Sequence, residues 1–516
     1  ILGRVGVEFV DMDSGELIPN HWVRGGCSYG VLPCNGLIYA PPHPCACYIR
    51  AKLSGFNALA SKRERRVLPA DPSGEDNRLE KGPAYKKVTR TSAAAGDWPT
   101  FRANPARNSC GTSLPGHRLD VSWTKNIGGK LSTLTAAGGK VYVASVDRHT
   151  IHALDAASGA EAWSFTAGGP VDSPPTWHQG YLLFGSADGY VYCLSAEEGT
   201  LAWRFRAAPA DMRLFSYDAL ESVWPVHGSI LVQDSTAWFA AGRCSYMDGG
   251  IHVYRLDAVT GELLSVTQVN DRDPETGLEP QESISGFSME GALPDILSCQ
   301  EGRIYMRHRC FDTNGDQQDT YPHMFSPAGY LDDTWWHRTY WIIAKTMGDG
   351  WGGWPTRGGQ VPAGRILVAN QETVYGYGRS RYYKGGGHVG MGGTTYRLFS
   401  CQHPEATQNG AKDKENGNGD HNWTQNVGVT VRGMLLAGDS LVLAGAPDPS
   451  HGEKLSKAAL EGGEGGLLEC RSASSGEPIS KIRLDAMPVF DGLIAAEGRL
   501  YLSNIEGEVV CITAEE

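Results

Sequence analysis

The stretch ALDAASGAEAWSF, at residues 153–165, recurs in modified form three more times along the chain. The copies are CLSAEEGTLAWRF at 193–205, RLDAVTGELLSV at 255–266 and the weaker CRSASSGEPISKI at 470–482. Each copy follows a short segment in which apolar and polar residues alternate, as a packed strand requires. Repeats of about 40 residues that each form one small sheet cannot bury their own faces, so several must stack radially. The repeat therefore predicts an all-β protein, a β-propeller.

Each repeat carries its own turn, and the first two copies carry a tryptophan beyond it. The residues DAASG at 155–159 are typical of a turn in which Asp caps the backbone and Gly accepts a positive φ. Trp163 and Trp203 follow at the start of the next, outer strand. A ring there can cover the gap between neighbouring blades, and its N–H needs a hydrogen-bond partner. We therefore interpret these tryptophans as structural.

The spacing of strand-like segments predicts one propeller over residues 1–516, with eight four-stranded antiparallel blades. Seven blades start near 130, 169, 222, 290, 354, 426 and 485, and the cysteine-rich residues 25–61 form another; seven or nine blades would also fit. The last unit lacks an outer strand, so we expect the N-terminal segment, residues 1–24, to complete it and close the ring. A charged inter-blade insertion at 62–97 and decorated loops at 310–345 and 376–393 are expected to interrupt the repeats.

Composition limits the classes of partner. The net charge of −12 disfavours nucleic acid, which needs a basic face, although KRERR at 62–66 is a local basic run in a predicted linker. No run of eighteen apolar residues exists, so no transmembrane segment is expected. The chain begins at Ile1 in a strand-like phrase, and we expect a targeting segment, an upstream domain or both to precede it.

Twelve cysteines suggest an oxidising compartment, periplasmic or extracellular. Four of them cluster as Cys27, Cys34, Cys45 and Cys47, in a spacing unlike the common zinc sites. Two interpretations stay open for this cluster: disulfides that staple loops, or free thiols and a soft-metal site.

Two further groups are candidates for chemistry. Oxygen-bearing side chains at alternate positions of a tight loop, Asp312, Asn314 and Asp316, with Asp319 after them, suit Ca²⁺, although Gln317 stands where a calcium loop has Gly. An aromatic and basic set in the decorated loops could stack on sugars and pair with acidic groups. Its members are Trp335, Trp336, His337, Arg338, Arg379, Arg381, Tyr382, Tyr383 and His388. An ordinary polar turn and ordinary loop packing are the alternative interpretations.

The repeat resembles the PQQ-like propeller repeat of quinoprotein dehydrogenases and outer-membrane assembly scaffolds. Further phrases, DWPTFRANPARNSCG at 97–111 and the residues 21–49 and 221–251, are similar to planctomycete-type PQQ-binding-like propeller proteins. The resemblance spans nearly the whole chain and implies fold better than activity. Quinoprotein dehydrogenases typically place two adjacent cysteines against the quinone, whereas here Cys45 and Cys47 are separated by Ala46. A bound PQQ is therefore not expected.

Three functions remain as hypotheses. The first is an extracytoplasmic scaffold that binds a glycan or protein ligand at the funnel face, and whether it is also an enzyme stays open. The second is a polysaccharide-active enzyme, a lyase or hydrolase, with its site in the funnel. The third is a quinone- or metal-dependent oxidoreductase. We expect the aromatic and basic set to gather in one patch near the central axis.

Overall fold

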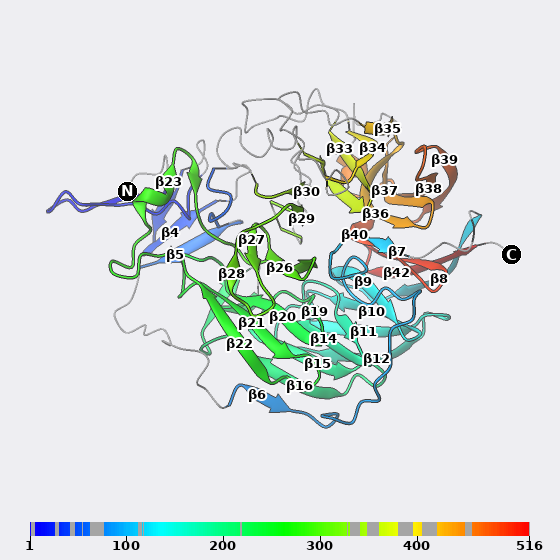
Figure 1. Ribbon diagram of the computed structural model, residues 1–516, viewed down its shortest axis with the longest axis horizontal. Coiled ribbons are helices and arrows are strands. Elements are labelled where there is room, and N and C mark those ends of the chain that lie inside the picture. Colours follow the sequence, from blue (N-terminus) through cyan, green and yellow to red (C-terminus); the bar gives the residue numbers. More distant parts are fainter. Residues whose placement is uncertain are drawn as a thin grey trace.

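The chain folds into sheets that stand radially around a common centre, as the ribbon of the computed structural model shows (Figure 1). The structure describes residues 1, 6–25, 30–41, 47–53, 55–61, 77–111, 116, 118–216, 219–327, 329–330, 341–347, 361–379, 396–404, 421–448 and 457–514. The architecture is all-β and antiparallel in nearly every pairing, which is the arrangement of a β-propeller.

The repeats that decide the fold form the first three sheets, with their strands in sequence order from the centre outward. The first holds β9 (Leu131–Ala137), β10 (Lys140–Ser145), β11 (Thr150–Asp155) and β12 (Glu161–Thr166). The second holds β13 (Thr176–His178), β14 (Tyr181–Gly185), β15 (Tyr190–Ser195) and β16 (Leu201–Arg206), and β6 (Leu79–Lys81) is added at its edge. The third holds β19 (Leu231–Gln233), β20 (Thr236–Ala241), β21 (Ile251–Asp257) and β22 (Leu263–Val269).

Two sheets follow in the part of the chain with weaker repeats. One is made of β25 (Ser298–Gln300), β26 (Arg303–Met306), β27 (Arg309–Phe311) and β28 (Gln317–Gln318). The other has three strands, β29 (His323–Phe325), β30 (Trp341–Ala344) and β31 (Ala363–Gly364). Strands β28, β29 and β30 lie in the segment 310–345 that the sequence predicted as a decorated loop.

Three more sheets follow along the chain. The first is β32 (Ile366–Ala369), β33 (Thr373–Arg379), β34 (Tyr396–Gln402) and β35 (His421–Gln425). The next is β36 (Val429–Ala437), β37 (Ser440–Pro447), β38 (Gly466–Ser472) and β39 (Pro478–Leu484), with β7 (Cys110–Gly111) alongside β36. The last is β40 (Pro488–Ala496), β41 (Arg499–Asn504), β42 (Glu508–Ala514) and β8 (Leu119–Asn126), and one helical turn, α2 (Lys457–Leu460), precedes β38.

The last sheet is completed by β8 and not by the N-terminal segment, so the predicted mode of closure is wrong. β8 pairs antiparallel with β42 from Leu119↔Ala514 to Asn126↔Glu508. The strands of the N-terminal segment, β1 (Phe9–Val10) and β2 (Leu17–Ile18), pair only with each other among the described residues. The closing strand thus lies after the charged insertion, where the alternation of DVSWTKN continues directly into the first repeat.

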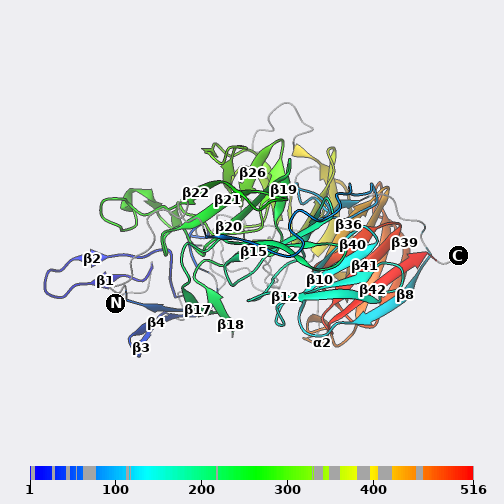
Figure 2. The same ribbon diagram turned by 90° about the horizontal axis from the view of Figure 1, so that it is seen from below.

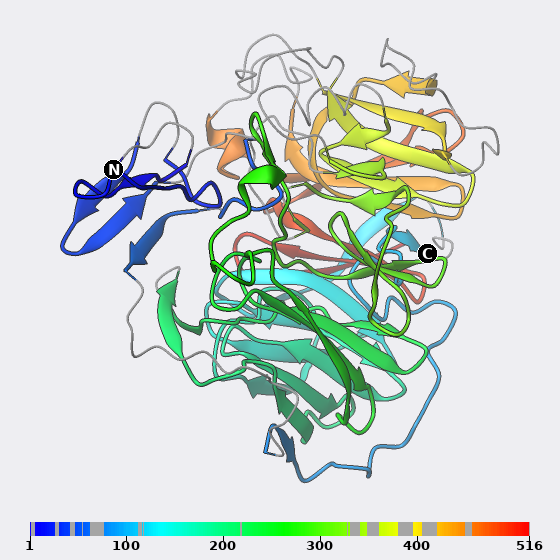
Figure 3. The same ribbon diagram turned by 60° about the vertical axis from the view of Figure 1, so that its left-hand side comes forward.

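The cysteine-rich residues do not take the place of a blade in the described part of the chain. Their strands β3 (Leu32–Cys34), β4 (Leu37–Ala40) and β5 (Asn57–Ala60) form a sheet beside the ring, drawn in blue (Figures 1 and 3). Buried Trp22 and Tyr48 attach this N-terminal unit to Cys244, Tyr246 and Met289. Two small hairpins also project: β17 (Arg213–Ser216) with β18 (Ala219–Ser222), visible in Figure 2, and β23 (Ile284–Ser285) with β24 (Ser288–Met289) after the 3-10 turn η2 (Gln281–Ser283).

The predicted structural role of the repeat tryptophans is confirmed. Trp163 Nε1 donates to Ala196 O over 3.1 Å, and Trp203 Nε1 donates to Val259 O over 3.0 Å, so each ring reaches the turn of the next sheet. Trp123 and Trp423 do the same with Ala156 and Ala473. Each ring also lies against the turn glycine of the next sheet: a Cβ on Gly199 would stand 2.5 Å from Trp163. The turn glycine is therefore needed for contact between the sheets as well as for its positive φ.

Candidate functional site

Residues 97–111, the axial segment, run through the centre of the ring and bind the inner strands one after another. Trp98 exchanges backbone hydrogen bonds with Ala136 of β9. The carbonyls of Pro99, Pro105, Asn108 and Ser109 accept from the N–H groups of Trp177 in β13, Cys299 in β25, Ala369 in β32 and Leu436 in β36. One short segment therefore ties five sheets together and fills the central space at its level.

An ion pair anchors the axial segment on the side of the last sheet. Arg102 Nη1 donates to both carboxylate oxygens of Asp491 at 2.7 and 2.8 Å, and both side chains are buried. The guanidinium also lies over the Trp341 ring, 4.1 Å from its centre. Burial raises the pKa of Asp491, and the charge of Arg102 opposes that rise. The pair joins the axial segment to β40 and β30 at once.

Arg107, also in the axial segment, is completely buried. Its Nη1 donates to Thr100 Oγ1 over 2.6 Å and to the Phe101 carbonyl over 3.0 Å, while its Nε donates to the Leu297 carbonyl over 3.0 Å. Burial lowers the pKa of Arg107 to about 10, so the guanidinium keeps its charge at neutral pH. The acceptors of these three hydrogen bonds are two carbonyl oxygens and one hydroxyl oxygen, and none of them is a carboxylate.

Four connections between strands carry a set of polar side chains, the mouth cluster: Asp172 before β13, His227 before β19, Asp295 before β25, and Arg307 between β26 and β27. His227 Nδ1 lies 2.8 Å from Asp172 Oδ2, and the other Asp172 oxygen accepts the N–H of Gly228. Burial disfavours the charged imidazole, but the Asp172 carboxylate outweighs this and raises the pKa of His227. The pair is partly exposed, with 27% of the His227 side chain accessible, so a ligand can reach it.

The second pair of the mouth cluster is more deeply placed. Asp295 accepts the N–H groups of Ile296 and Tyr330, and Arg307 Nε lies 3.6 Å from its Oδ2. The charges of Asp295 and Arg307 both act on the His227 ring. A histidine held by one carboxylate and flanked by an arginine can exchange a proton with a ligand or bind an anionic group. The sequence contains no local motif that would have signalled this cluster, because its members come from four different connections.

Most of the predicted aromatic and basic set lies outside the described residues. This holds for Trp335, Trp336, His337, Arg338, Arg381, Tyr382, Tyr383 and His388. Arg379 is described: it ends β33 and its side chain is buried. The predicted gathering of this set in one patch therefore stays a prediction.

The predicted calcium loop forms the turn between β27 and β28. Asp312 Oδ1 accepts the N–H groups of Asn314 at 2.8 Å and Asp316 at 3.0 Å, which is the turn-capping role. The carbonyls of Asn314 and Gly315 accept from Arg255 and Thr267, so the turn docks on the preceding sheet. Within the described ranges no three His, Cys, Asp or Glu side chains gather as a metal site would require. Calcium binding by Asp312, Asn314, Asp316 and Asp319 stays a prediction.

Two members of the cysteine cluster are described. Cys34 is an exposed thiol without a disulfide, whereas Cys47 is buried in the core of the N-terminal unit. Cys27 and Cys45 lie outside the described residues, so a disulfide or soft-metal role for the rest of the cluster stays a prediction.

Comparison with known proteins supports the resemblance of the repeat to a known family. Residues 118–284 match the family model of the outer membrane protein assembly factor BamB. A segment of 70 residues is 33% identical to that assembly factor from Moranella endobia (strain PCIT). The segment covers 14% of this chain and 18% of the relative, so the match spans only a small part of the relative's length.

Solved structures extend the likeness to most of the chain. The quinohemoprotein alcohol dehydrogenase from Comamonas testosteroni has a TM-score of 0.51 at 13% identity, with 81% of this chain and 80% of the other covered. BamB from Moraxella catarrhalis has a TM-score of 0.33 at 11% identity, with 77% and 97% covered. Residues 118–284 are thus similar to the PQQ-like repeat family, and at 13% identity the likeness to the solved dehydrogenase shows the fold alone, a β-propeller.

The residues present do not fit the quinone and calcium that the resemblance implies. The sequence contains no two adjacent cysteines, and the described part of the chain gathers no acidic cluster of three. Trp98, Phe101 and Arg107 of the axial segment are buried. The absence of a bound quinone stays a prediction. Among the described residues, no helix has the length and apolar character to cross a membrane.

Proposed function

We propose that the protein is an extracytoplasmic interaction scaffold that binds a protein or glycan ligand on the face that carries the mouth cluster. The observation that carries the proposal is the axial segment, whose carbonyls bind five inner strands and fill the centre. A ring fixed in this way is a rigid support for loops, and rigid scaffolds commonly present binding residues on loops. The matched family is named for outer membrane protein assembly, which supports a protein partner.

Affinity capture tests the scaffold. The wild-type chain and a His227→Ala variant, each immobilised at equal amount, are exposed to cell-envelope extract of the source organism. We expect a defined set of partners on the wild-type protein that is depleted at least about tenfold on the variant. Arg483→Gln, an exposed change on the outer strand β39, is the matched control and keeps the full set. Equal capture by all three chains would contradict binding at the mouth cluster.

A polysaccharide-active enzyme is the second candidate, and the Asp172–His227 pair favours it. A histidine whose charged form is stabilised beside an arginine is suited to acid–base work next to an anionic sugar. The test is incubation with acidic polysaccharides while the ultraviolet absorbance of unsaturated uronates is recorded. Turnover that His227→Gln abolishes, with the melting temperature unchanged, would favour the enzyme over the scaffold.

We further propose eight blades and a periplasmic or secreted location. Within the described ranges, eight sheets stand around the centre, from β9–β12 to β40–β42 with β8, apart from the sheet of β3–β5 beside them, and this arrangement supports the blade number. The words "outer membrane" in the name of the matched family support the location. An experimental structure with every residue placed tests the first proposal, and fractionation of cells that express the full gene product tests the second.

A further inference from the structure

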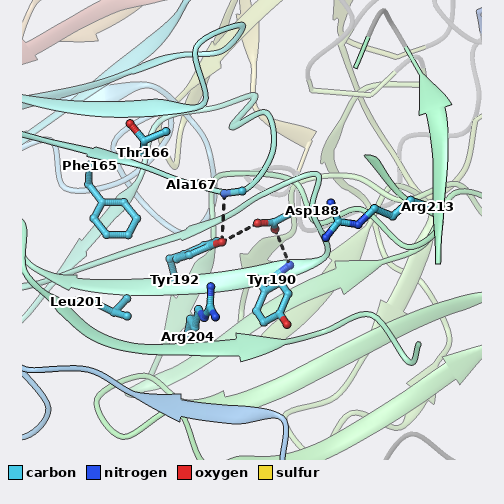
Figure 4. Close-up of a pocket in the computed structure, with 10 residues that line it drawn as sticks. Phe165, Thr166, Ala167, Asp188, Tyr190, Tyr192, Leu201, Arg204 and Arg213 are labelled. Carbon is cyan, nitrogen blue, oxygen red and sulfur yellow. Dashed lines mark hydrogen bonds between the residues drawn. The ribbon is translucent and has the colours of Figure 1, made fainter. Parts of the chain in front are cut away.

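A pocket of about 390 Å³ lies between the sheet of β9–β12 and the next sheet, and Figure 4 shows the side chains that line it. Its walls come from the end of β12, from β15 and β16 of the next sheet, and from β17 of the projecting hairpin. The residues that matter here are Phe165, Asp188, Tyr190, Tyr192, Arg204 and Arg213. The volume falls within the roughly 300–1,000 Å³ that is usual for small-ligand sites.

Some of these side chains hold the pocket in shape. Tyr192 donates its hydroxyl to Asp188 Oδ2 over 2.6 Å, and the Tyr190 N–H donates to Asp188 Oδ1 over 3.0 Å. Arg204 donates to Glu80 Oε2 from Nε at 2.9 Å and from Nη2 at 2.7 Å, and its guanidinium lies 5.0 Å from the Tyr190 ring centre. The edge strand β6, which brings Glu80, thus fixes the orientation of one wall.

Other groups remain able to meet a ligand. A carboxylate has about four acceptor positions, so Asp188 can accept further hydrogen bonds. The Arg213 side chain is 47% exposed, and its guanidinium points toward Asp188 in Figure 4. The rings of Phe165 and Tyr190 provide the apolar surface of the wall. An aromatic wall beside one acceptor and one donor suits a ring that carries hydroxyl groups.

The local charge selects a neutral ligand. Arg204 is paired with Glu80, and Arg213 Nε lies 3.3 Å from Asp211, so each cation already has a carboxylate. Asp188 adds a negative charge that is bound by a hydroxyl and a backbone N–H. An acidic sugar would place its carboxylate against this excess of negative charge, whereas the hydroxyl groups of a neutral sugar are complementary to Asp188 and Arg213.

We propose that this side pocket binds a neutral hexopyranose unit, with ring contacts to Tyr190 and Phe165 and hydroxyl contacts to Asp188 and Arg213. The proposal concerns a site distinct from the mouth cluster and does not depend on the function proposed there.

Titration calorimetry with methyl glucoside, methyl galactoside and methyl mannoside, each paired with its uronate, tests the site. We expect one neutral glycoside to bind the wild-type chain at least about tenfold more tightly than its uronate, and Arg213→Gln to weaken that binding at least about tenfold. Asp188→Asn should weaken it as well, and Arg483→Gln is the control without effect. Because Asp188 also caps a turn, the exposed Arg213 variant keeps the test independent of folding. Absence of binding by every neutral glycoside, tighter binding of a uronate, or unchanged binding by Arg213→Gln would overturn the proposal.

Discussion

Arg102 and Asp491 meet at the centre of the ring, where the guanidinium of the axial segment binds both oxygens of a carboxylate on β40. Both side chains are buried, and the arginine also covers Trp341 of β30. A single arginine side chain therefore connects three parts of the chain that are far apart in sequence.

Removal of one partner of this pair should destabilise the protein strongly. Asp491→Asn leaves the Arg102 charge buried and uncompensated, and such changes cost about 3–5 kcal/mol of the free energy of unfolding. Urea unfolding followed by tryptophan fluorescence measures the loss. The matched control is Glu80→Gln, which breaks the exposed pair with Arg204 and should cost less than about 1 kcal/mol. A loss below about 1 kcal/mol for Asp491→Asn would show that the ion pair does not anchor the axial segment.

The turn glycines should differ in their tolerance of alanine according to the space beside them. Gly199 has a φ of +71° and a Cβ there would stand 2.5 Å from Trp163, whereas Gly302 has a φ of +73° and nothing within 4 Å. Gly302→Ala should cost about 1–2 kcal/mol, from the backbone conformation alone. Gly199→Ala should cost at least about 1 kcal/mol more, because the added methyl group displaces the ring. Thermal unfolding of both variants measures the difference, and equal costs would show that the ring moves freely.

Acid should weaken the fold through His252. Burial, with the nearby Arg78 charge, lowers the pKa of His252 from 6.5 to about 4. The unfolded chain binds a proton between these values and the folded chain does not, so stability is lost as the pH falls through this window. From about pH 7.5 to about pH 4.5 this one group should remove about 2.5 kcal/mol. His252→Phe should lose that much less over the same range in urea unfolding. An identical pH dependence of the two proteins would show that His252 is not buried as a neutral ring.

The titration of His227 should depend on Asp172. Because the carboxylate stabilises the charged imidazole, Asp172→Asn should move the pKa of His227 to a lower value. Proton NMR of the His227 Cε1–H resonance measures the titration. Asp211→Asn, an exposed change beside Arg213, is the control and should leave the His227 curve in place. An unchanged pKa of His227 in Asp172→Asn would show that the two side chains do not interact in solution.

The repeat made the propeller predictable because it combines strand alternation, turn chemistry and a tryptophan whose N–H needs a partner. Trp163 and Trp203 find their partners in the turn of the next sheet, as expected. The closing strand was assigned to the wrong end of the insertion because residues 1–24 and 119–126 both read as strands. Alternation of polar and apolar residues identifies a strand but not the edge with which it pairs.

The axial segment and the mouth cluster could not be predicted from the sequence to the same extent. The phrase DWPTFRANPARNSCG was recognisable as a resemblance, yet its path through the centre depends on hydrogen bonds to five strands that are scattered over the chain. Asp172 and His227 belong to two different connections, and nothing in the local sequence relates them. Long-range contacts of this kind follow from the topology of the ring and not from periodicity.

The pairing of β8 with β42 has a consequence for synthesis of the chain. β8 leaves the ribosome before the first repeat, but its partner is among the last residues described. Until then the early strand presents unpaired N–H and C=O groups, which is the state in which sheet edges join other chains. The last sheet therefore cannot be completed until β42 has been synthesised, and a binding factor that covers β8 in the nascent chain would improve the yield of folded protein.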